Sequence, residues 1–419
     1  MLARRLRQAR APYGELRPLI GPFAQPIARV SGPAGLLEEA GRGLPEGAAQ
    51  PEALAVRLRR SGVELSWGEP QLVPSRSAFL SLCEARGASS VEVARADPAL
   101  LTELQLGSFF HAYWRRRVIR RAACALRLSP SLLPASTLGA DVAFWRGVRS
   151  VATRTERDRF TRSSYVVFYY HGVATGRTGW EQLHASPQRV ARQLRLLDRL
   201  GFRALSPEEL MAFHADPRQT LPPKSFVVCA DDGFRTAVDA LRQHSALRPQ
   251  IFVNTAEVGG TADWGGDEPL ADWEELRAFA EAGGVIGSHC RTHPRLPELD
   301  DDTLGDELTG ARRELEDRLP NASPLFAYPY GLHDERVRSA VAAAGYRLAF
   351  TTEPGRNGAG TDPYCLRRIG LKDWDGIAAL LWLAFTGELL PWFWERRRRR
   401  RTRRRGSRGV PCSRLPGRP

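Results

Sequence analysis

The sequence predicts an α/β protein whose mostly parallel sheet closes into a barrel. The chain has 419 residues and is 42% hydrophobic, which is enough for a large core with additional regions. From about residue 163, short β-branched and aromatic runs alternate with amphipathic helical patterns. About seven such β-α units lie within residues 163–371, and this alternation is typical of a parallel sheet that curls into a barrel.

The predicted strands are short apolar runs, each ending near a turn or a polar residue. In chain order they occupy residues 163–173, 225–230, 250–255, 285–289, 325–331, 347–352 and 365–371. The helical patterns between them lie at residues 186–202, 234–244, 270–284, 301–319 and 334–346. In the first helix we expect Ser186 at the N-cap, Leu194 on the apolar face and Gly201 at the end.

The rest of the chain divides by composition into four further regions. Residues 1–105 are rich in Ala, Gly, Pro, Arg and Leu and stay unassigned, whereas residues 106–162 have a mostly helical pattern. Residues 372–395 form an amphipathic apolar segment. Residues 396–419 are an arginine-rich tail that we expect to be disordered, because it has too few apolar residues to build a core.

The net charge of +14 belongs largely to this tail. Residues 396–419 contain twelve arginines and no acidic residue, so the preceding chain carries only +2. No aromatic residue is interleaved within residues 396–408, so we expect no specific recognition of nucleic acid. One interpretation is that residues 377–408 make a peripheral contact with an anionic membrane. The alternative is a last packing helix followed by a disordered tail.

Neither end of the sequence indicates a membrane span. The first residues are basic and lack the continuous apolar segment of a signal peptide. The apolar segment near the other end is interrupted by Gly387, Glu388 and Pro391. We therefore expect the protein to be cytoplasmic, or peripheral at the cytoplasmic face of the membrane.

Two adjacent carboxylates follow one of the predicted strands. Asp231 and Asp232 come directly after the run at residues 225–230, and Gly233 permits a sharp turn. Catalytic sites of β/α barrels lie at the carboxyl ends of the strands. Buried carboxylates are costly unless they are paired, so two of them in an apolar context suggest a bound metal. An Asp-Asp-Gly turn that merely caps a helix would look similar.

Two histidines follow a later strand of the same series. His289 and His293 are four residues apart, just after the apolar run that begins at residue 285. Two imidazoles and one carboxylate are a common open zinc set with a position left for water. Ordinary turn histidines are the alternative. The coincidence of both motifs at strand ends favours the metal site.

Two more strand ends contribute polar groups. His171 ends the first strand, and a Pro-Tyr-Gly turn, Pro329 to Gly331, follows a later one. A lone histidine is often structural, but here it would share a rim with the metal. We expect the turn to direct a backbone N–H into the site as an oxyanion donor.

These residues resemble a known family, the polysaccharide deacetylases of carbohydrate esterase family 4, which share the NodB-like domain. The Asp-Asp-Gly, the His-x-x-x-His and the Pro-Tyr-Gly turn match in order and spacing over residues 163–371. Within the family, the strand ending in Tyr-His is similar to the circularly permuted poly-N-acetylglucosamine deacetylase branch.

The resemblance implies a distorted (β/α)7-type barrel that binds a divalent metal, and Zn²⁺ is the ion we expect. Asp232, His289 and His293 would be the metal ligands. The implied reaction is hydrolysis of an N-acetyl group on an amino sugar in a polysaccharide or glycoconjugate.

The resemblance also implies the catalytic roles. Asp231 would be the general base, His171 the general acid, and Tyr330 would donate its backbone N–H to the oxyanion. Pro329 and Tyr330 would contact substrate. Trp264, in a glycine-rich loop, would stack on a sugar face or, alternatively, hold its loop against the barrel.

The sequence departs from the family pattern in the third motif. Many relatives have an arginine two residues before the proline, where this chain has Ala327. That arginine normally holds the base, so we name Arg368 as its replacement; an ordinary surface arginine is the alternative. Cys290 stands where a serine or threonine is usual, and we expect it to replace that hydroxyl rather than to be a fourth ligand.

Two other functions compete with the deacetylase. A catalytically weakened barrel would keep the metal and act as a carbohydrate- or membrane-associated binding or scaffold protein, which Ala327 favours. A different amidohydrolase or esterase would use the same zinc site.

Overall fold

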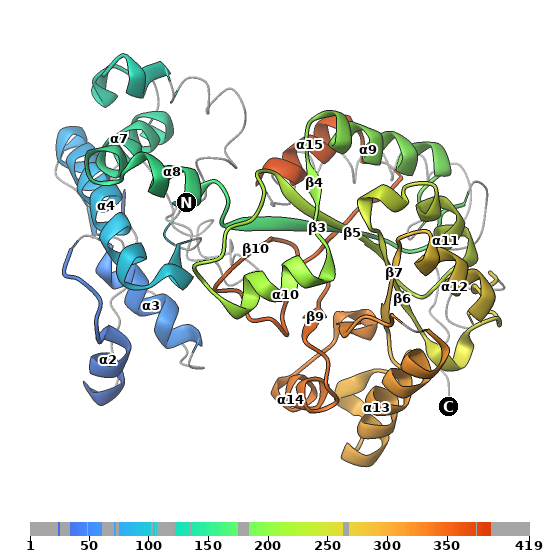
Figure 1. Ribbon diagram of the computed structural model, residues 1–419. Helices are drawn as coiled ribbons and strands as arrows, with labels where there is room; N and C mark the ends of the chain where they lie inside the picture. Colours follow the sequence, from blue (N-terminus) through green and yellow to red (C-terminus); the bar gives the residue numbers. More distant parts are fainter. Residues whose placement is uncertain are drawn as a thin grey trace, which may run out of the picture.

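The computed structural model describes most of the chain between residues 24 and 386 (Figure 1). The described residues are 24–25, 34–47, 49–60, 71–72, 75–101, 104, 106, 120, 122–133, 136–174, 184–262, 268–319, 321–373 and 375–386. The predicted tail at residues 396–419 lies outside them.

The larger part of the molecule is a curled, mostly parallel sheet with helices around it (Figure 1). Its central strands follow one another in the order β3-β5-β6-β7-β8-β9, and each neighbouring pair is parallel. Their bounds are β3 Ser164–Tyr170, β5 Ser225–Ala230, β6 Gln250–Val253, β7 Val285–Ser288, β8 Leu325–Ala327 and β9 Leu348–Phe350. This architecture confirms the predicted α/β fold.

A final segment brings the two edges of this series together. Leu366 forms a parallel bridge with Phe350 of β9, and its backbone N–H donates to Ala349 O at 2.9 Å. Directly afterwards, β11 (Ile369–Gly370) pairs in parallel with β3. Residues 366–370 therefore contact both the last and the first strand of the series, as the (β/α)7-type expectation requires.

Three short elements were not predicted. β4 (Arg203–Ala204) pairs with β5, and α10 (Pro207–Ala215) follows it behind a capping box at Ser206. β10 (Arg356–Gly358) pairs antiparallel with β3, on the side of β3 that faces away from β5.

The predicted helices lie outside the sheet (Figure 1). Their bounds are α9 Pro187–Arg199, α11 Arg235–Arg242, α12 Trp273–Glu281, α13 Asp301–Arg318 and α14 Glu335–Ala343. In α9 the predicted apolar face is buried, and Gly201 follows the end in a left-handed conformation. Ser186 is at the N-cap, but its hydroxyl does not cap the helix; it donates to Asp373 Oδ1 at 2.7 Å.

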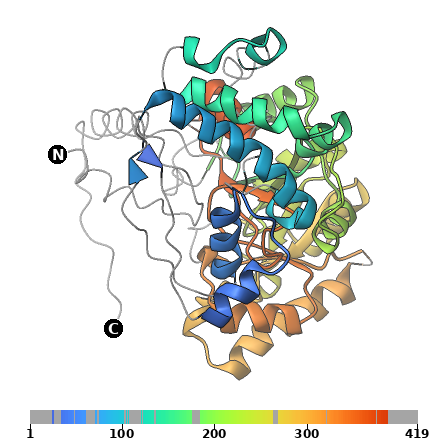
Figure 2. The same cartoon turned by 90° about the vertical axis from the view of Figure 1, so that its left-hand side faces the viewer.

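The preceding residues contribute a separate group of helices with its own apolar cluster. Their bounds are α2 Ala34–Gly41, α3 Gln50–Arg60, α4 Arg76–Ala96, α7 Ser136–Val151 and α8 Arg154–Phe160, with a small strand pair β1 Ala24–Gln25 and β2 Gln71–Leu72. Figure 2 shows α4 and α7 side by side. They approach closely at Gly87 and Gly147, where an added Cβ would lie 1.9 Å and 1.8 Å from backbone oxygens of the facing helix.

The last described helix, α15 (Ile377–Thr386), packs on the barrel. Leu380 and Leu383 are buried in the same cluster as the apolar face of α9, and the buried Arg356 donates to Ala384 O at 3.0 Å. Residues 377–386 therefore agree with the alternative of a last packing helix. Within the described part of the chain, no helix combines the length and apolarity needed to cross a membrane.

Candidate metal centre and catalytic site

The strand register brings the first two polar strand ends together. Tyr170, the last residue of β3, pairs with Ala230, the last residue of β5. His171 and Asp231 are therefore the next residues along two adjacent strands, and Asp231 N–H donates to Tyr170 O at 3.1 Å. This placement follows directly from two parallel strands that end at the same level.

The register also fixes the histidine pair. Val253 of β6 pairs with Ser288 of β7, and His289 N–H donates to Val253 O at 2.8 Å. The His289 ring reaches across to the next strand, where its Nδ1 lies 2.7 Å from Ala327 O. Because Nδ1 donates to that carbonyl, Nε2 keeps its lone pair for a ligand.

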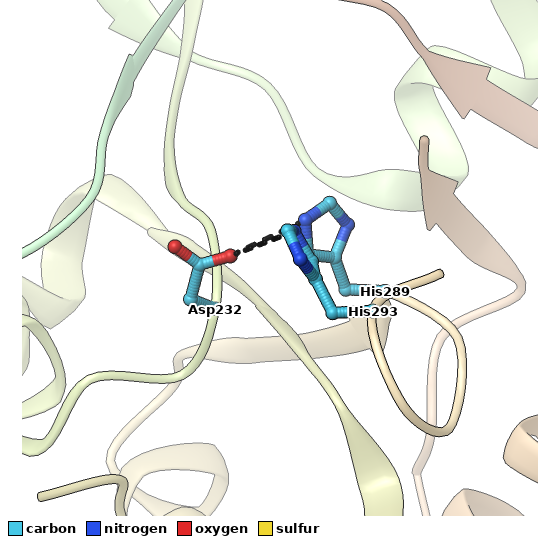
Figure 3. A group of neighbouring side chains, drawn as sticks. All are labelled: Asp232, His289 and His293. Carbon is cyan, nitrogen blue, oxygen red and sulfur yellow. Dashed lines mark ion pairs between the residues drawn. The ribbon is translucent and has the colours of Figure 1, made fainter. Parts of the chain in front are cut away.

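Asp232, His289 and His293 converge from two strand ends (Figure 3). One ligand atom from each residue lies within 4.8 Å of the others, and all three side chains are buried. Asp232 Oδ1 is 3.4 Å from His289 Nε2 and 3.5 Å from His293 Nε2.

These distances fit a metal ion better than direct hydrogen bonds. An N–H···O hydrogen bond is usually about 2.7–3.2 Å long. Ligand atoms about 2.1 Å from a tetrahedral ion are about 3.4 Å apart, which matches the two Asp232 contacts. Two imidazoles and one carboxylate are also the donor set of open catalytic metal sites. The three residues can hold a divalent metal and leave a coordination position open.

The charges of Asp232 and His293 support ligation, whereas burial of His289 is outweighed by the carboxylates of Asp232 and Asp231, which raise the pKa of its imidazole. Burial alone would raise the pKa of Asp232, but contact with the His289 imidazole and the nearby histidines outweighs it and lowers that pKa. Burial, together with His289, lowers the pKa of His293 to about 3, so this imidazole is neutral at neutral pH. A neutral imidazole and an ionised carboxylate are the forms that bind metals.

Asp231 is held by Arg368 in a buried two-point ion pair. Arg368 Nη1 lies 2.6 Å from Asp231 Oδ1, and Nη2 lies 2.8 Å from Oδ2. The guanidinium also lies over the Tyr169 ring, 4.5 Å from its centroid. Arg368 is completely buried, so the surface-arginine alternative is wrong.

The pair keeps Asp231 ionised. Burial alone would raise the pKa of Asp231, but Arg368, with His289, outweighs it and lowers that pKa. The carbonyl of Ala327 contacts His289 Nδ1, so this position supports the ligand group and not the base. Arg368, directly before β11, makes the two-point contact with Asp231.

His171 is partly buried and lies within the electrostatic reach of both aspartates. Burial lowers the pKa of His171, and the carboxylates of Asp232 and Asp231 oppose this shift without cancelling it. Its ring also contacts Tyr169, with 5.5 Å between the centroids.

The Pro-Tyr-Gly turn lies against the metal ligands. The Tyr330 ring is half exposed and lies 4.5 Å from the His293 ring, whereas Pro329 is buried beneath it. Half of the Tyr330 side chain is therefore open to solvent beside the ligand group, whereas the Pro329 side chain is not.

The backbone is strained around the site. Of the non-glycine residues described, Asp232, Cys290, His293 and Tyr330 all have positive φ, between 58° and 71°. Such conformations cost free energy and persist where the surrounding structure enforces them, often at functional sites.

Glu307 of α13 was not singled out from the sequence. Its carboxylate accepts hydrogen bonds from the N–H of Arg291 at 2.8 Å, the N–H of Thr292 at 3.1 Å and the Thr292 hydroxyl at 2.6 Å. Glu307 thus fixes the loop between the two histidines. Nothing in the sequence distinguishes it from the other acidic residues of that helix.

Two remaining predictions concern neighbouring residues. The Cys290 thiol is buried in an apolar cluster with Leu304 and Tyr328, and it is not part of the ligand group. Burial raises the pKa of Cys290 well above its usual range, as expected for an inert thiol. Trp264 lies outside the described residues.

Comparisons with known proteins agree with the motifs. Residues 218–349 match the family model described as polysaccharide deacetylase. No curated protein matches the chain.

Several solved structures are similar to the described fold. The deacetylase PplD of Streptococcus pyogenes, in complex with acetate, has 22% identity and a TM-score of 0.47, and the match covers 54% of this chain and 100% of that one. IcaB from Ammonifex degensii has 23% identity and a TM-score of 0.45, and the match covers 54% of this chain and 97% of that one. A de-N-acetylase from Aggregatibacter actinomycetemcomitans has 15% identity and a TM-score of 0.44, and the match covers 51% of this chain and 97% of that one.

The family match covers the Asp-Asp-Gly, the His-x-x-x-His and the Pro-Tyr-Gly turn, and the resemblance stated from the motifs is confirmed at the level of the family. The chain therefore contains a polysaccharide deacetylase domain.

Proposed function

We propose that the protein is a metal-dependent hydrolase that removes N-acetyl groups from an amino sugar in a polysaccharide or glycoconjugate. The observation that carries this proposal is the ligand group Asp232, His289 and His293 beside the buried Asp231–Arg368 pair. Together with the deacetylase domain, it supports hydrolysis of an amide rather than simple carbohydrate binding.

Zinc is the metal we propose. Two imidazoles and one carboxylate suit Zn²⁺, although the same donors also accept cobalt and nickel. When bound, a divalent ion polarises the acetyl carbonyl and activates the attacking water.

The residues around the metal group divide the remaining chemistry. Asp231 would accept the proton of the attacking water, and Arg368 would keep its carboxylate ionised and oriented. His171 would protonate the departing amine, and the backbone N–H of Tyr330 would stabilise the oxyanion. Because burial lowers the pKa of His171, its protonated form is favoured only below the usual range of an imidazole.

The scaffold alternative has less support. It rested on the missing arginine at Ala327, and Arg368 takes over the contact with Asp231.

Release of acetate from short N-acetylglucosamine oligomers tests the proposal. We expect acetate with the zinc-loaded protein, loss of it after chelation, and recovery when zinc is added back. Metal binding without acetate release would support the scaffold instead. Acetate release from O-acetyl esters alone would indicate a different esterase.

A further inference from the structure

A chain of contacts leads from Cys365 through His333 to the Pro-Tyr-Gly turn. Cys365 Sγ lies 3.6 Å from His333 Nε2, and His333 Nδ1 lies 3.1 Å from Gly331 O. The His333 ring also stacks on Tyr328, with 4.8 Å between centroids and 22° between planes. Neither His333 nor Cys365 belongs to the metal-ligand group.

The partners of its two ring nitrogens determine how His333 is oriented. Burial and Asp362 raise the pKa of the Cys365 thiol to about 11, although Arg338 opposes this, so the thiol keeps its proton at neutral pH. Arg338 Nη1 donates to the sulfur at 3.5 Å, and the thiol lies within reach of two acceptors, Asp362 and His333 Nε2. Because a carbonyl oxygen only accepts, Nδ1 carries the N–H and donates to Gly331 O.

The backbone of the Pro-Tyr-Gly turn is strained, so a further contact that holds it is significant. Tyr330 has φ 58° and Gly331 has φ 72°, both in the left-handed region. A Cβ at Gly331 would lie 2.1 Å from the Thr352 hydroxyl, so no side chain fits there. The turn has two backbone hydrogen bonds of its own, Gly331 N–H to Tyr328 O at 2.9 Å and Leu332 N–H to Pro329 O at 3.1 Å.

We propose that His333 is a positioning residue that holds the Tyr330 turn in its reactive geometry through its Nδ1 contact with Gly331 O. This inference rests on the proposed function, because the turn matters for catalysis only if Tyr330 donates to the oxyanion. His333 itself contacts neither the ligand group nor the base among the contacts described above.

A matched pair of substitutions distinguishes the roles of the two ring nitrogens of His333. In His333→Asn the amide nitrogen takes the place of Nδ1, so the donor to Gly331 O is kept. In His333→Gln the amide nitrogen takes the place of Nε2, so that donor is lost. His333→Ala removes both, and Cys365→Ser and Cys365→Ala test the contact of Cys365 with Nε2. All variants are made in the full-length, zinc-loaded chain.

Acetate release gives the first readout. We expect His333→Gln and His333→Ala to lower kcat about tenfold, less than the 10²–10³-fold typical of losing an oxyanion donor outright. KM and zinc content stay unchanged, and His333→Asn and Cys365→Ser keep near-normal kcat. Equal kcat for the Asn and Gln variants would overturn the proposal, as would a parallel fall of kcat and zinc content.

Hydrogen exchange of the turn gives a readout that does not need activity. If the wild-type protein releases no acetate, the proposed function fails, and the amides of Gly331 and Leu332 then decide the positioning role. We expect them to exchange about tenfold faster in His333→Gln than in His333→Asn, because the turn opens more often. Equal exchange rates would overturn the proposal. The comparison holds even if His333→Ala fails to fold, since both amide variants keep a polar side chain.

Discussion

Asp231 lies next to the ligand Asp232 in sequence, yet it belongs to the arginine pair and not to the metal group. Adjacent residues after a strand point in different directions, and the positive φ of Asp232 adds a sharp bend. Two neighbouring carboxylates can thus have separate tasks, one as ligand and one as base.

Removing the charge of Asp231 tests the base directly. Asp231→Asn should lower kcat by about two to four powers of ten, the range for loss of general acid–base catalysis. Zinc content should stay at the wild-type level, because the ligand group is untouched. Acetate release and metal analysis on the same preparation check this. Near-normal turnover with metal bound would rule out the assignment.

Removing the partner of Asp231 tests the buried pair through stability. Arg368→Ala leaves a buried carboxylate unpaired, so at pH 7 we expect a loss of about 3–5 kcal/mol in the free energy of unfolding. The pKa of Asp231 is lowered in the folded protein, so the stabilisation is present above the unfolded pKa of about 4 and is lost as the pH falls below it.

The difference between wild type and Arg368→Ala should therefore narrow as the pH falls below about 4, because the unfolded chain then binds a proton at this carboxylate while the folded wild-type carboxylate stays ionised. Urea unfolding from pH 7 to pH 3 measures this. Arg367→Ala, at a partly exposed neighbouring position, is the control and should show a smaller, pH-independent loss. If wild type and Arg368→Ala differed by the same unfolding free energy at every pH from 7 to 3, the ion-pair explanation would be contradicted.

At the scale of elements, parallel strands that end at one level create the site. The sequence predicts this part well, because the strands are apolar runs with polar residues at their ends, and their carboxyl ends converge in any such barrel. The sequence alone therefore places His171, Asp231 and His289 at the carboxyl ends of the strands.

Other elements could not be predicted because their signals depend on distant partners. β10 reads Arg-Asn-Gly, which has no strand propensity, and it forms only because β3 offers an open edge. Glu307 is one carboxylate among several on α13, and its role depends on a loop that only folding brings near. Arg368 could be named as a candidate, but its burial could not be predicted from its neighbours.

The contact between α4 and α7 depends on two glycines. An alanine at Gly87 or Gly147 would force its Cβ against a backbone oxygen of the facing helix, so each substitution should cost about 1–3 kcal/mol in the free energy of unfolding. Gly305→Ala in α13 is the matched control, because its Cβ would meet nothing within 4 Å.

We expect the control to gain about 0.5–1 kcal/mol from the better helix propensity of alanine. Chemical denaturation of the three variants checks these values. A Gly87→Ala variant as stable as Gly305→Ala would show that the two helices do not pack as described.

At the scale of the whole molecule, the metal site, the N-terminal helices and the arginine-rich tail are separate in sequence. α15 buries Leu380 and Leu383 on the barrel, so the membrane contact that we proposed from the sequence depends mainly on residues 387–408, outside the described part. The charge of the tail is the physical basis for that contact.

Deleting residues 396–419 separates this contact from catalysis. We expect unchanged turnover of soluble oligomers, because the described site contains none of these residues. Binding to anionic vesicles should weaken, since twelve arginines are removed. Co-sedimentation with anionic and neutral vesicles measures this, and unchanged binding would remove the membrane proposal.

Anomalous diffraction at the zinc edge, from crystals of the zinc-loaded protein, tests the metal centre most directly. We predict a peak enclosed by Asp232 Oδ1, His289 Nε2 and His293 Nε2, about 2.0–2.2 Å from each. Zinc bound elsewhere, with no density among these three side chains, would contradict the metal-dependent mechanism.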